Sequence, residues 1–228
     1  MNKRTVIVSG GMLEEDFVLP ILKSEETELV IGEAICRHCT FAHKDKGLEF
    51  LYKHQIKPDY IVGDFDSVSH ELVEYYREEI NVPIREFNPV KDASDTEIAL
   101  RLCLGLNRRE IWILGATGNR IDHLWANVQC LQIALEADAD ARIIDSHNQI
   151  RLIDKDITLK KSEAFGPYFS LFPLELPVDE LSIRGAKYPL KNHFLKPNDS
   201  LCVSNEFKED EVTISFVYGK VILMETRD

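Results

Sequence analysis

The sequence has no long hydrophobic run, and this absence excludes a class of protein. No apolar stretch reaches the ~18–20 residues that a membrane-spanning helix needs. Near the start only Val6-Ile7-Val8 is apolar before Ser9 and two glycines. That run is too short for the apolar segment of a signal peptide, and it predicts a first strand. We therefore expect a cytoplasmic protein that does not enter a membrane.

Basic residues are also few, because 27 Lys and Arg face 39 Asp and Glu, for a formal net charge of −12. This balance argues against duplex nucleic acid, which proteins bind by neutralising phosphates with Lys and Arg, and against an anionic membrane surface. It allows a phosphate ligand held through a divalent metal, and it favours a cationic substrate. The five cysteines are an odd number in a chain of 228 residues, which argues against a disulfide framework. Cys36 and Cys39 form a single CxxC pair and are interpreted as unligated.

The first two-thirds of the chain alternate between strand and helix patterns. Short apolar runs predict strands at residues 5–8, 28–31, 60–62, 111–114 and 141–144, with another within 81–87. Amphipathic spacing predicts helices at 14–23, 47–54, 71–79, from Ser94 or Asp95 onward, and over 124–135. The acidic residues of the 71–79 helix are interpreted as a solvated face. The pattern predicts an α/β domain in which helices flank a mainly parallel sheet.

From about Asn148 the helical periodicity disappears. Seven short alternating runs follow, separated by turn residues, at 150–153, 157–159, 168–171, 181–183, 200–203, 213–217 and 221–224. Such spacing predicts an antiparallel β-sandwich or roll. We therefore expect two domains, 1–146 and 147–228.

Three polar loops follow predicted strands of the first domain, where ligands bind in open α/β sheets. In the first, Gly63-Asp64-Phe65-Asp66-Ser67, two carboxylates at i and i+2 project to the same side of an extended backbone. Two anions this close favour a cation between them, and Mg²⁺ suits oxygen ligands. The alternative is that Asp64 or Asp66 caps the next helix.

The second loop is Lys91-Asp92-Ala93-Ser94-Asp95-Thr96, at the start of a predicted helix. The helix N-terminus could hold a phosphate, Lys91 could contact it, and Asp92 or Asp95 could join the metal cluster. Taken alone, the segment favours the simpler interpretation, a helix cap with acidic residues that oppose the dipole.

The third loop is Gly115-Ala-Thr-Gly118-Asn119-Arg120-Ile121-Asp122-His123. Its glycines permit close approach of a ligand, and Arg120 offers a planar fork to phosphate oxygens. Asn127 lies one helical turn beyond His123 on the same face. The alternative is a surface pair of Arg120 and Asp122 on an ordinary turn. Trp112 and Trp125 are interpreted as core residues.

Together these three loops resemble those of the bacterial thiamine pyrophosphokinases. The resemblance continues in the second domain through Gly185-x-Lys187-Tyr188-Pro189-Leu190 and Ser204-Asn205-Glu206. It implies a catalytic α/β domain and a thiamine-binding β-sandwich. It also implies transfer of the terminal diphosphate of ATP to the thiamine hydroxyl, giving thiamine diphosphate and AMP. A homodimer is implied, with each thiamine site between the catalytic domain of one subunit and the sandwich of the other.

The same resemblance assigns roles to residues. It implies that Asp64, Asp66 and Asp95 bind Mg²⁺ and phosphate, and that an upstream metal ligand falls on Asp45, with Glu33 as its rival. Arg120 and Asp122 fall in the catalytic loop, and Asp122 or Asp45 would orient or deprotonate the thiamine hydroxyl. The implied ATP-binding residues are Lys91, Asp92, Ser94, Gly115, Gly118, His123 and Asn127. Ser204 and Asn205 would face thiamine, and Phe216 or Tyr218 could stack on it, unless no aromatic residue does.

Overall fold

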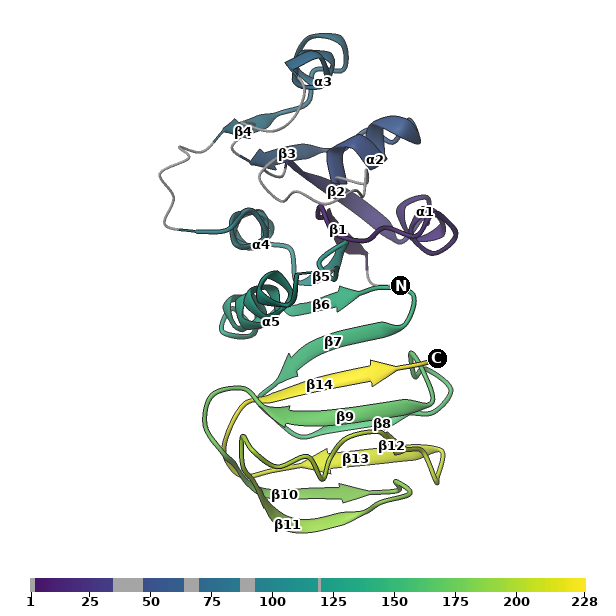
Figure 1. Cartoon of the computed structure of the whole chain (residues 1–228), viewed down its shortest axis with the longest axis vertical. Helices are drawn as coiled ribbons and strands as arrows, with labels where there is room; N and C mark the ends of the chain where they lie inside the picture. The colour runs from purple at the N-terminus through teal and green to yellow at the C-terminus, as the bar shows by residue number, and fades with distance from the viewer. Residues whose placement is uncertain (1–2, 35–46, 64–69, 87–92, 119) are drawn as a thin grey trace. The chain divides into compact units, whose positions relative to one another are not determined.

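The computed structural model describes residues 3–34, 47–63, 70–86, 93–118 and 120–228. It divides into two compact units, Met1–Ser146 and His147–Asp228 (Figure 1). We call them unit 1 and unit 2 and describe each by itself. No helix in the described part of the chain is long and apolar enough to cross a membrane.

Unit 1 contains a sheet of six strands in the order β6-β5-β1-β2-β3-β4, and all neighbouring pairs are parallel. The strands are β1 (Arg4–Val8), β2 (Thr27–Ala34), β3 (Tyr60–Gly63), β4 (Ile84–Glu86), β5 (Glu110–Leu114) and β6 (Asp140–Ile144). Every residue of β1 is buried, as expected for a central strand covered on both faces. The predicted mainly parallel α/β fold is confirmed.

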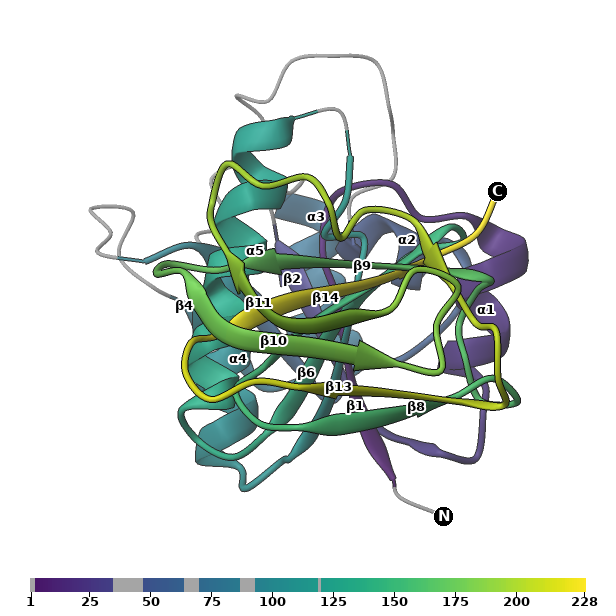
Figure 2. The same cartoon turned by 90° about the horizontal axis from the view of Figure 1, so that it is seen from below.

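Helices connect these strands on both faces of the sheet. They are α1 (Glu15–Leu22), α2 (Gly47–Lys53), α3 (His70–Glu74), the π-helical turn η1 (Tyr75–Glu79), α4 (Asp95–Gly105) and α5 (Ile121–Leu135). Figures 1 and 2 show α1 and α2 on one side and α4 and α5 on the other. The right-handedness of parallel crossovers explains this, because the chain progresses outward from β1 in one direction and from β5 in the other.

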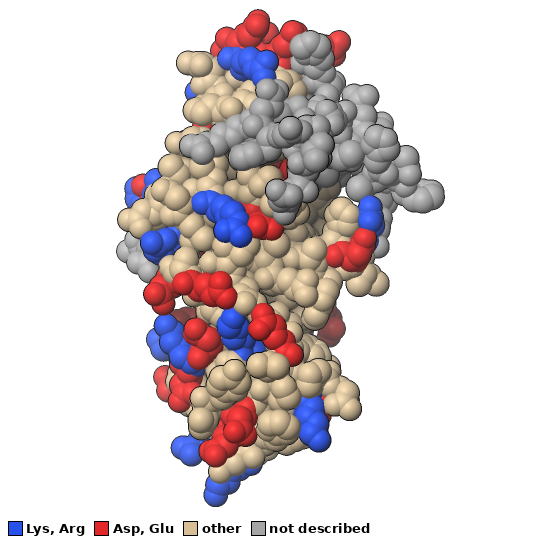
Figure 3. Space-filling view, turned by 90° about the vertical axis from the view of Figure 1, so that its left-hand side faces the viewer, with Lys and Arg blue, Asp and Glu red and all other residues tan. Residues whose placement is uncertain are grey.

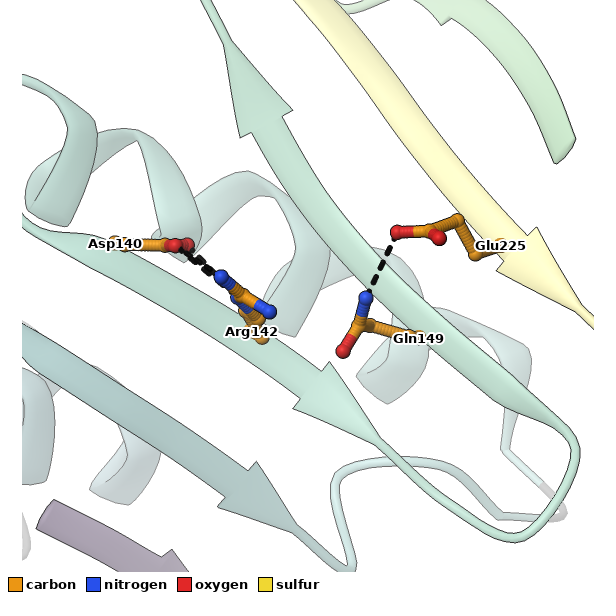
Figure 4. A network of polar contacts seen from close by, with 4 residues as sticks. All are labelled: Asp140, Arg142, Gln149 and Glu225. Carbon is orange, nitrogen blue, oxygen red and sulfur yellow. Dashed lines mark hydrogen bonds and ion pairs between the residues drawn. The ribbon is translucent and has the colours of Figure 1, made fainter. Parts of the chain in front are cut away.

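The surface of unit 1 carries both signs of charge (Figure 3). Acidic atoms gather over α3 and η1, at the top of that view, and Glu71, Glu74, Glu78 and Glu79 are all exposed. The predicted solvated face of this helix is therefore confirmed. On β6, the guanidinium of Arg142 donates from Nε to both carboxylate oxygens of Asp140 at 3.1 Å (Figure 4).

The prediction that both tryptophans lie in the core is wrong for Trp125. Its side chain is 47% exposed, whereas Val128 and Leu131 of the same helix are buried. Trp112 is half-buried on β5, where the Arg4 guanidinium lies 4.0 Å from its ring centroid.

Unit 2 consists of two antiparallel sheets, with strand orders β12-β9-β14-β7 and β11-β10-β13-β8. The strands are β7 (Asn148–Ile153), β8 (Ile157–Lys160), β9 (Tyr168–Pro173), β10 (Val178–Arg184), β11 (Leu190–Leu195), β12 (Asn205–Glu206), β13 (Glu211–Ser215) and β14 (Val221–Thr226). Leu171 and Leu223 from the first sheet share one buried cluster with Leu181 and Ile214 from the second. Because one core lies between two sheets, the predicted antiparallel sandwich is confirmed.

The polar interior of this sandwich is satisfied by cross-strand pairing. Gln149 on β7 and Glu225 on β14 are register partners, and Gln149 Nε2 donates to Glu225 Oε2 at 2.8 Å (Figure 4). The backbone N–H of Phe165 donates to the other carboxylate oxygen at 3.3 Å. Glu225 is only 4% exposed, so these hydrogen bonds offset the cost of burying its carboxylate.

The predicted strand at 200–203 is wrong, and a strand at Leu190–Leu195 was not predicted. Residues 200–203 form a turn, because the Asp199 carboxylate accepts a hydrogen bond from the Leu201 N–H at 2.9 Å and competes with strand pairing. The Leu190–Leu195 strand lies at the edge of its sheet with mostly exposed side chains, so its sequence shows little alternation. Asn192 within it has a positive φ of 49°.

Candidate active site

The candidate site of unit 1 lies where the connections of its sheet change direction. Strands β1 and β5 are parallel neighbours, so their carboxyl ends meet at the same edge. From β1 the chain proceeds toward β2, whereas from β5 it proceeds toward β6. The two loops diverge at this switch point, which is where ligands bind in open α/β sheets.

The loops after β1 and β5 are joined by hydrogen bonds between their backbones. Gly11 N donates to Gly115 O at 2.7 Å, and Met12 N donates to Thr117 O at 3.0 Å. A Cβ on Gly11 would lie 2.2 Å from Thr117 O, and Gly115 has a φ of +68°. Only glycine fits both places without strain, so these two residues hold the loops together.

Gly118 differs from these two glycines. It is exposed, and a Cβ there would come no closer than 3.7 Å to another atom. Of the two glycines predicted to bind ATP, Gly115 therefore has a structural requirement, whereas Gly118 is exposed and a Cβ there would make only ordinary contacts.

Asn127 supports the turn after β5 from within the unit. Its side chain is 8% exposed, and Nδ2 donates to the carbonyl oxygen of Ala116 at 3.0 Å. His123, one turn earlier on α5, is exposed. The two residues predicted on one helix face thus differ, since Asn127 holds the loop and His123 reaches solvent.

Arg120 and Asp122 form an ion pair at the start of α5, as in the alternative interpretation of this loop. Arg120 Nε donates to Asp122 Oδ1 at 3.1 Å, and Nη2 donates to Oδ2 at 2.5 Å. The guanidinium, assisted by the N–H of His123 at the helix N-terminus, lowers the pKa of Asp122 to about 2. Both side chains are more than half exposed. A carboxylate with so low a pKa is a weak proton acceptor at neutral pH and is better suited to orienting a group.

The start of α4 has the predicted cap. Ser94 is the N-cap residue, and its Oγ accepts a hydrogen bond from Glu97 N at 3.2 Å. Asp95 is the first residue of the helix and is half-buried, so its carboxylate lies at the positive end of the helix dipole.

Glu33 has a different environment from the other candidate carboxylates. It lies on β2 with 0% exposure, and its Oε2 accepts hydrogen bonds from the hydroxyls of Ser9 at 2.7 Å and Thr96 at 3.3 Å. Neither Ser9 nor Thr96 was predicted as a site residue. Ser9 had a usable signal, because it directly follows the first strand and precedes two glycines.

Several predicted residues lie outside the described part of the chain. These are Asp45, Asp64, Asp66, Lys91 and Asp92, together with Cys36 and Cys39. Among the residues that are described, no group of three or more His, Cys, Asp or Glu side chains could hold a metal ion. The structure therefore supplies Asp95 alone of the four predicted metal ligands.

In unit 2, Asn205 is buried and Ser204 is exposed. Asn205 is 4% exposed, and its amide pairs with the backbone of Tyr188, donating to the carbonyl at 2.8 Å and accepting from the N–H at 3.0 Å. Ser204 has a φ of +56°, and its N–H donates to Ser170 Oγ at 2.9 Å. Of the two residues predicted to face thiamine, Asn205 therefore anchors the neighbouring segment of chain.

The aromatic residues that could stack on thiamine differ in exposure. Phe216 is partly buried against the core of unit 2, whereas Tyr218 is 61% exposed. Tyr188, held by Asn205, is 57% exposed, and Lys187 Nζ lies 5.5 Å from its ring centroid. Tyr188 was not among the predicted stacking residues, although it belongs to the motif Gly185-x-Lys187-Tyr188-Pro189-Leu190 that carries the resemblance.

Comparison with protein families gives two matches in chain order. The model described as "Thiamin pyrophosphokinase, catalytic domain" matches residues 33–143. The model described as "Thiamin pyrophosphokinase, vitamin B1 binding domain" matches residues 155–221. The first match lies within unit 1 and the second within unit 2.

Individual proteins show the same similarity. The thiamine pyrophosphokinase of Bacillus subtilis is 32% identical over 193 residues, which cover 84% of this chain and 89% of that protein. The crystal structure of a B. subtilis thiamine pyrophosphokinase aligns with a TM-score of 0.83 at 30% identity, over 99% of this chain and 100% of the other. The crystal structure from Geobacillus thermodenitrificans aligns with a TM-score of 0.80 at 28% identity, over 99% and 98%.

Proposed function

The chain belongs to the thiamin pyrophosphokinase family, and on that premise we propose how its residues perform the reaction. The activity is that of a thiamine diphosphokinase, which transfers the diphosphate of ATP to the hydroxyl of thiamine and releases AMP. We assign ATP to unit 1 and thiamine to unit 2. The match of a separate family model to each unit supports this division.

The phosphates of ATP are assigned to the edge of the sheet at the β1/β5 switch point. One observation carries this assignment: the connection from β5 to α5 is joined to the loop after β1 at Gly115, and it ends at the Arg120–Asp122 pair at the N-terminus of α5. Backbone N–H groups and a guanidinium are suited to phosphate oxygens. Phosphoryl transfer depends on such positioning and charge neutralisation more than on covalent chemistry.

The remaining predicted ATP-binding residues are assigned around this edge. Gly118 is exposed and has no side chain to keep a phosphate away, and Ser94 caps α4 with its N-terminal N–H groups at the same edge. His123 is exposed on the first turn of α5, and Asn127 keeps the turn in place. Lys91 and Asp92 are assigned from the resemblance alone.

Mg²⁺ fits the chemistry of the proposed donor set. Asp45, Asp64, Asp66 and Asp95 offer only carboxylate oxygens, which are the ligands that this hard ion prefers. Asp95, at the start of α4, is the member that the structure describes. When bound, the ion supplies positive charge to the phosphate oxygens of ATP.

The transfer step breaks one bond and forms another at the β-phosphorus. The thiamine hydroxyl oxygen bonds to that phosphorus, the bond to the oxygen bridging the α- and β-phosphates breaks, and AMP departs with that oxygen. Arg120 offsets charge on the transferred or departing phosphates. Asp122 is assigned to orient the thiamine hydroxyl, because its low pKa makes it a weak base. Asp45 is then the candidate that accepts the proton.

Thiamine is assigned to the surface around Ser204 in unit 2. Ser204 is exposed, and the buried amide of Asn205 fixes Tyr188 beside it. Tyr188 joins Tyr218 as a candidate for stacking on the thiamine rings, since both are exposed. We further propose a homodimer, with each thiamine site between unit 1 of one subunit and unit 2 of its partner. Exposed apolar side chains on unit 2, including Leu201 and Val203, support a buried interface there. A cytoplasmic location belongs to the same proposal.

Product analysis tests the assignment. Purified protein incubated with ATP, Mg²⁺ and thiamine should form AMP and thiamine diphosphate in equal amounts, and AMP should not form without thiamine. ADP as the nucleotide product, or phosphate release that needs no thiamine, would contradict it. The second outcome would indicate a phosphohydrolase that uses the same carboxylates to activate water.

A further inference from the structure

Glu33 is a buried carboxylate to which the proposed reaction gives no part. It occupies the last position but one of β2, and its side chain is 0% exposed. Val8 of β1 pairs with Gly32 of β2, so Ser9 and Glu33 follow at the same level of the sheet. That level is the carboxyl edge, where the ATP phosphates are assigned.

The carboxylate of Glu33 joins two hydroxyls from separate elements. Oε2 accepts from Ser9 Oγ at 2.7 Å and from Thr96 Oγ1 at 3.3 Å. Ser9 and Thr96 are each 4% exposed, so water competes little for these hydrogen bonds. In such surroundings a hydroxyl without an acceptor carries the full cost of its desolvation.

Ser9 is fixed to the loops that form the phosphate edge. Its N–H donates to Leu114 O at 2.8 Å, at the end of β5. Its carbonyl oxygen would lie 2.6 Å from a Cβ on Gly115 and 2.9 Å from a Cβ on Gly47. A shift of Ser9 therefore transmits directly to the turn that begins at Gly115.

Thr96 is fixed to the other side of the same edge. It is the second residue of α4, directly after Asp95 and two residues after the capping Ser94. Helix α4 packs on β1 and β2. A hydrogen bond from Thr96 to β2 sets the rotation and height of the N-terminus of α4 relative to the strands.

We propose that Glu33 is a positioning residue for ATP, whose carboxylate joins the loop after β1 to the first turn of α4. This inference rests on the proposed placement of ATP at the carboxyl edge of unit 1. Glu33 acts through Ser9 and Thr96 and does not touch the nucleotide or the metal. The hydrophobic core holds the strands and the helix together, whereas this contact sets the positions of the two chain segments to which the ATP phosphates are assigned.

The test compares three forms of the full-length protein: wild type, Glu33→Gln and Glu33→Met. Gln retains an acceptor oxygen for the two hydroxyls, whereas Met has a similar shape and no acceptor. We expect Glu33→Met to raise the KM for ATP and the Kd of a non-hydrolysable ATP analogue about tenfold, equivalent to about 1.4 kcal/mol. Its kcat should fall less than threefold and its KM for thiamine should stay within twofold. Glu33→Gln should stay within about threefold of wild type in every constant.

A matched pair at Thr96 tests the same contact if Glu33→Met fails to fold. Thr96→Val removes the hydroxyl with little change of shape, and Thr96→Ser keeps it. Thr96→Val should weaken binding of the ATP analogue about threefold, and Thr96→Ser should leave it unchanged. In a Glu33→Met background that folds, Thr96→Val should add nothing, because its partner is already gone.

Three results would overturn the inference. One is a Glu33→Met protein, or a Thr96→Val protein, that melts at a lower temperature but binds the ATP analogue as wild type does, which indicates a role in stability only. Another is an equal loss with Gln and Met, which indicates that charge or metal binding matters at this position. The third is a rise in the KM for thiamine, in the Glu33→Met protein, as large as the rise in its KM for ATP. Failure of the proposed function is separate, because it appears as wild-type protein that forms no AMP with thiamine.

Discussion

The candidate residues of unit 1 are charged side chains on loops joined at glycines, whereas those of unit 2 include an aromatic ring held by a buried amide. Arg120 and Asp122 are exposed and paired with each other, and the loops beneath them are joined backbone to backbone. Asn205 is 4% exposed and fully engaged with Tyr188, whose ring is 57% exposed. The difference suits the substrates proposed for the two units, since phosphates need charge at fixed positions and a thiamine ring needs a flat face.

Removal of the Arg120 guanidinium from unit 1 should have the largest effect on activity. Arg120→Ala should lower kcat/KM for ATP by about 10²–10³-fold, since one preorganised donor to developing charge contributes on that order. Steady-state kinetics with varied ATP measure it. Arg101→Ala is the matched control, because Arg101 is an exposed arginine paired with Glu97 on α4. If Arg101→Ala is equally damaging, net charge rather than position is responsible, and the assignment of Arg120 is wrong.

A single added methyl group should disrupt the contact between the loops after β1 and β5. Gly11→Ala should lower the free energy of unfolding by about 1–3 kcal/mol and reduce activity, because its Cβ meets a carbonyl oxygen at 2.2 Å. Urea denaturation followed by circular dichroism measures the stability. Gly105→Ala is the control, since a Cβ there meets nothing within 4 Å at the end of α4. It should raise stability by about 0.4–1 kcal/mol. If Gly11→Ala leaves the free energy of unfolding unchanged, the two loops are not held together at Gly11 as described.

Truncation of the buried Asn205 amide in unit 2 should weaken the binding of thiamine and leave the binding of ATP unchanged. Asn205→Ala should lower stability by about 1–3 kcal/mol, because it leaves the Tyr188 backbone groups without their partner. It should raise the KM for thiamine severalfold while the KM for ATP stays within twofold. Kinetics with each substrate varied in turn separate the two. An increase confined to the KM for ATP would reverse the division of roles between the units.

The smallest effect concerns the acid–base behaviour of the ion pair. The pKa of Asp122 is lowered to about 2 in the folded protein, chiefly by Arg120, from about 3.9 in an unfolded chain. A depressed folded-state pKa contributes stability that is present above about pH 4 and is lost as the pH falls toward 2. NMR titration of the Asp122 carboxyl measures this directly. Arg120→Gln should return its midpoint toward 3.9, and an unchanged midpoint would show that another group sets it.

The sequence predicted the architecture better than the details of the site, for a physical reason. Apolar runs and amphipathic spacing depend on which residues of a short segment are buried. The ends predicted for β1, β5 and α5 therefore lie close to the observed ones. The strand predicted at 200–203 failed because the Asp199 side chain competes for the backbone there. The edge strand Leu190–Leu195 has no buried face long enough to mark it.

Site residues could be predicted by type but not always by role. The pairing of Arg120 with Asp122 was the alternative interpretation of their loop, and it could be foreseen because the two residues lie two positions apart in the sequence. Asn205 and Asn127 are both engaged with backbone groups 17 and 11 residues away, which depends on tertiary structure. The contact of Glu33 with Thr96 spans 63 residues and follows only from the packing of α4 on β2.

Hydrogen exchange measured by mass spectrometry tests the division of substrates between the two units most directly. Protein with Mg²⁺ and a non-hydrolysable ATP analogue should show slower exchange in residues 9–12 and 115–123 and no change in residues 185–188. Added thiamine should then slow exchange in residues 185–188 and 203–206. Protection by the ATP analogue confined to the segments of unit 2, with none in residues 115–123, would contradict the account.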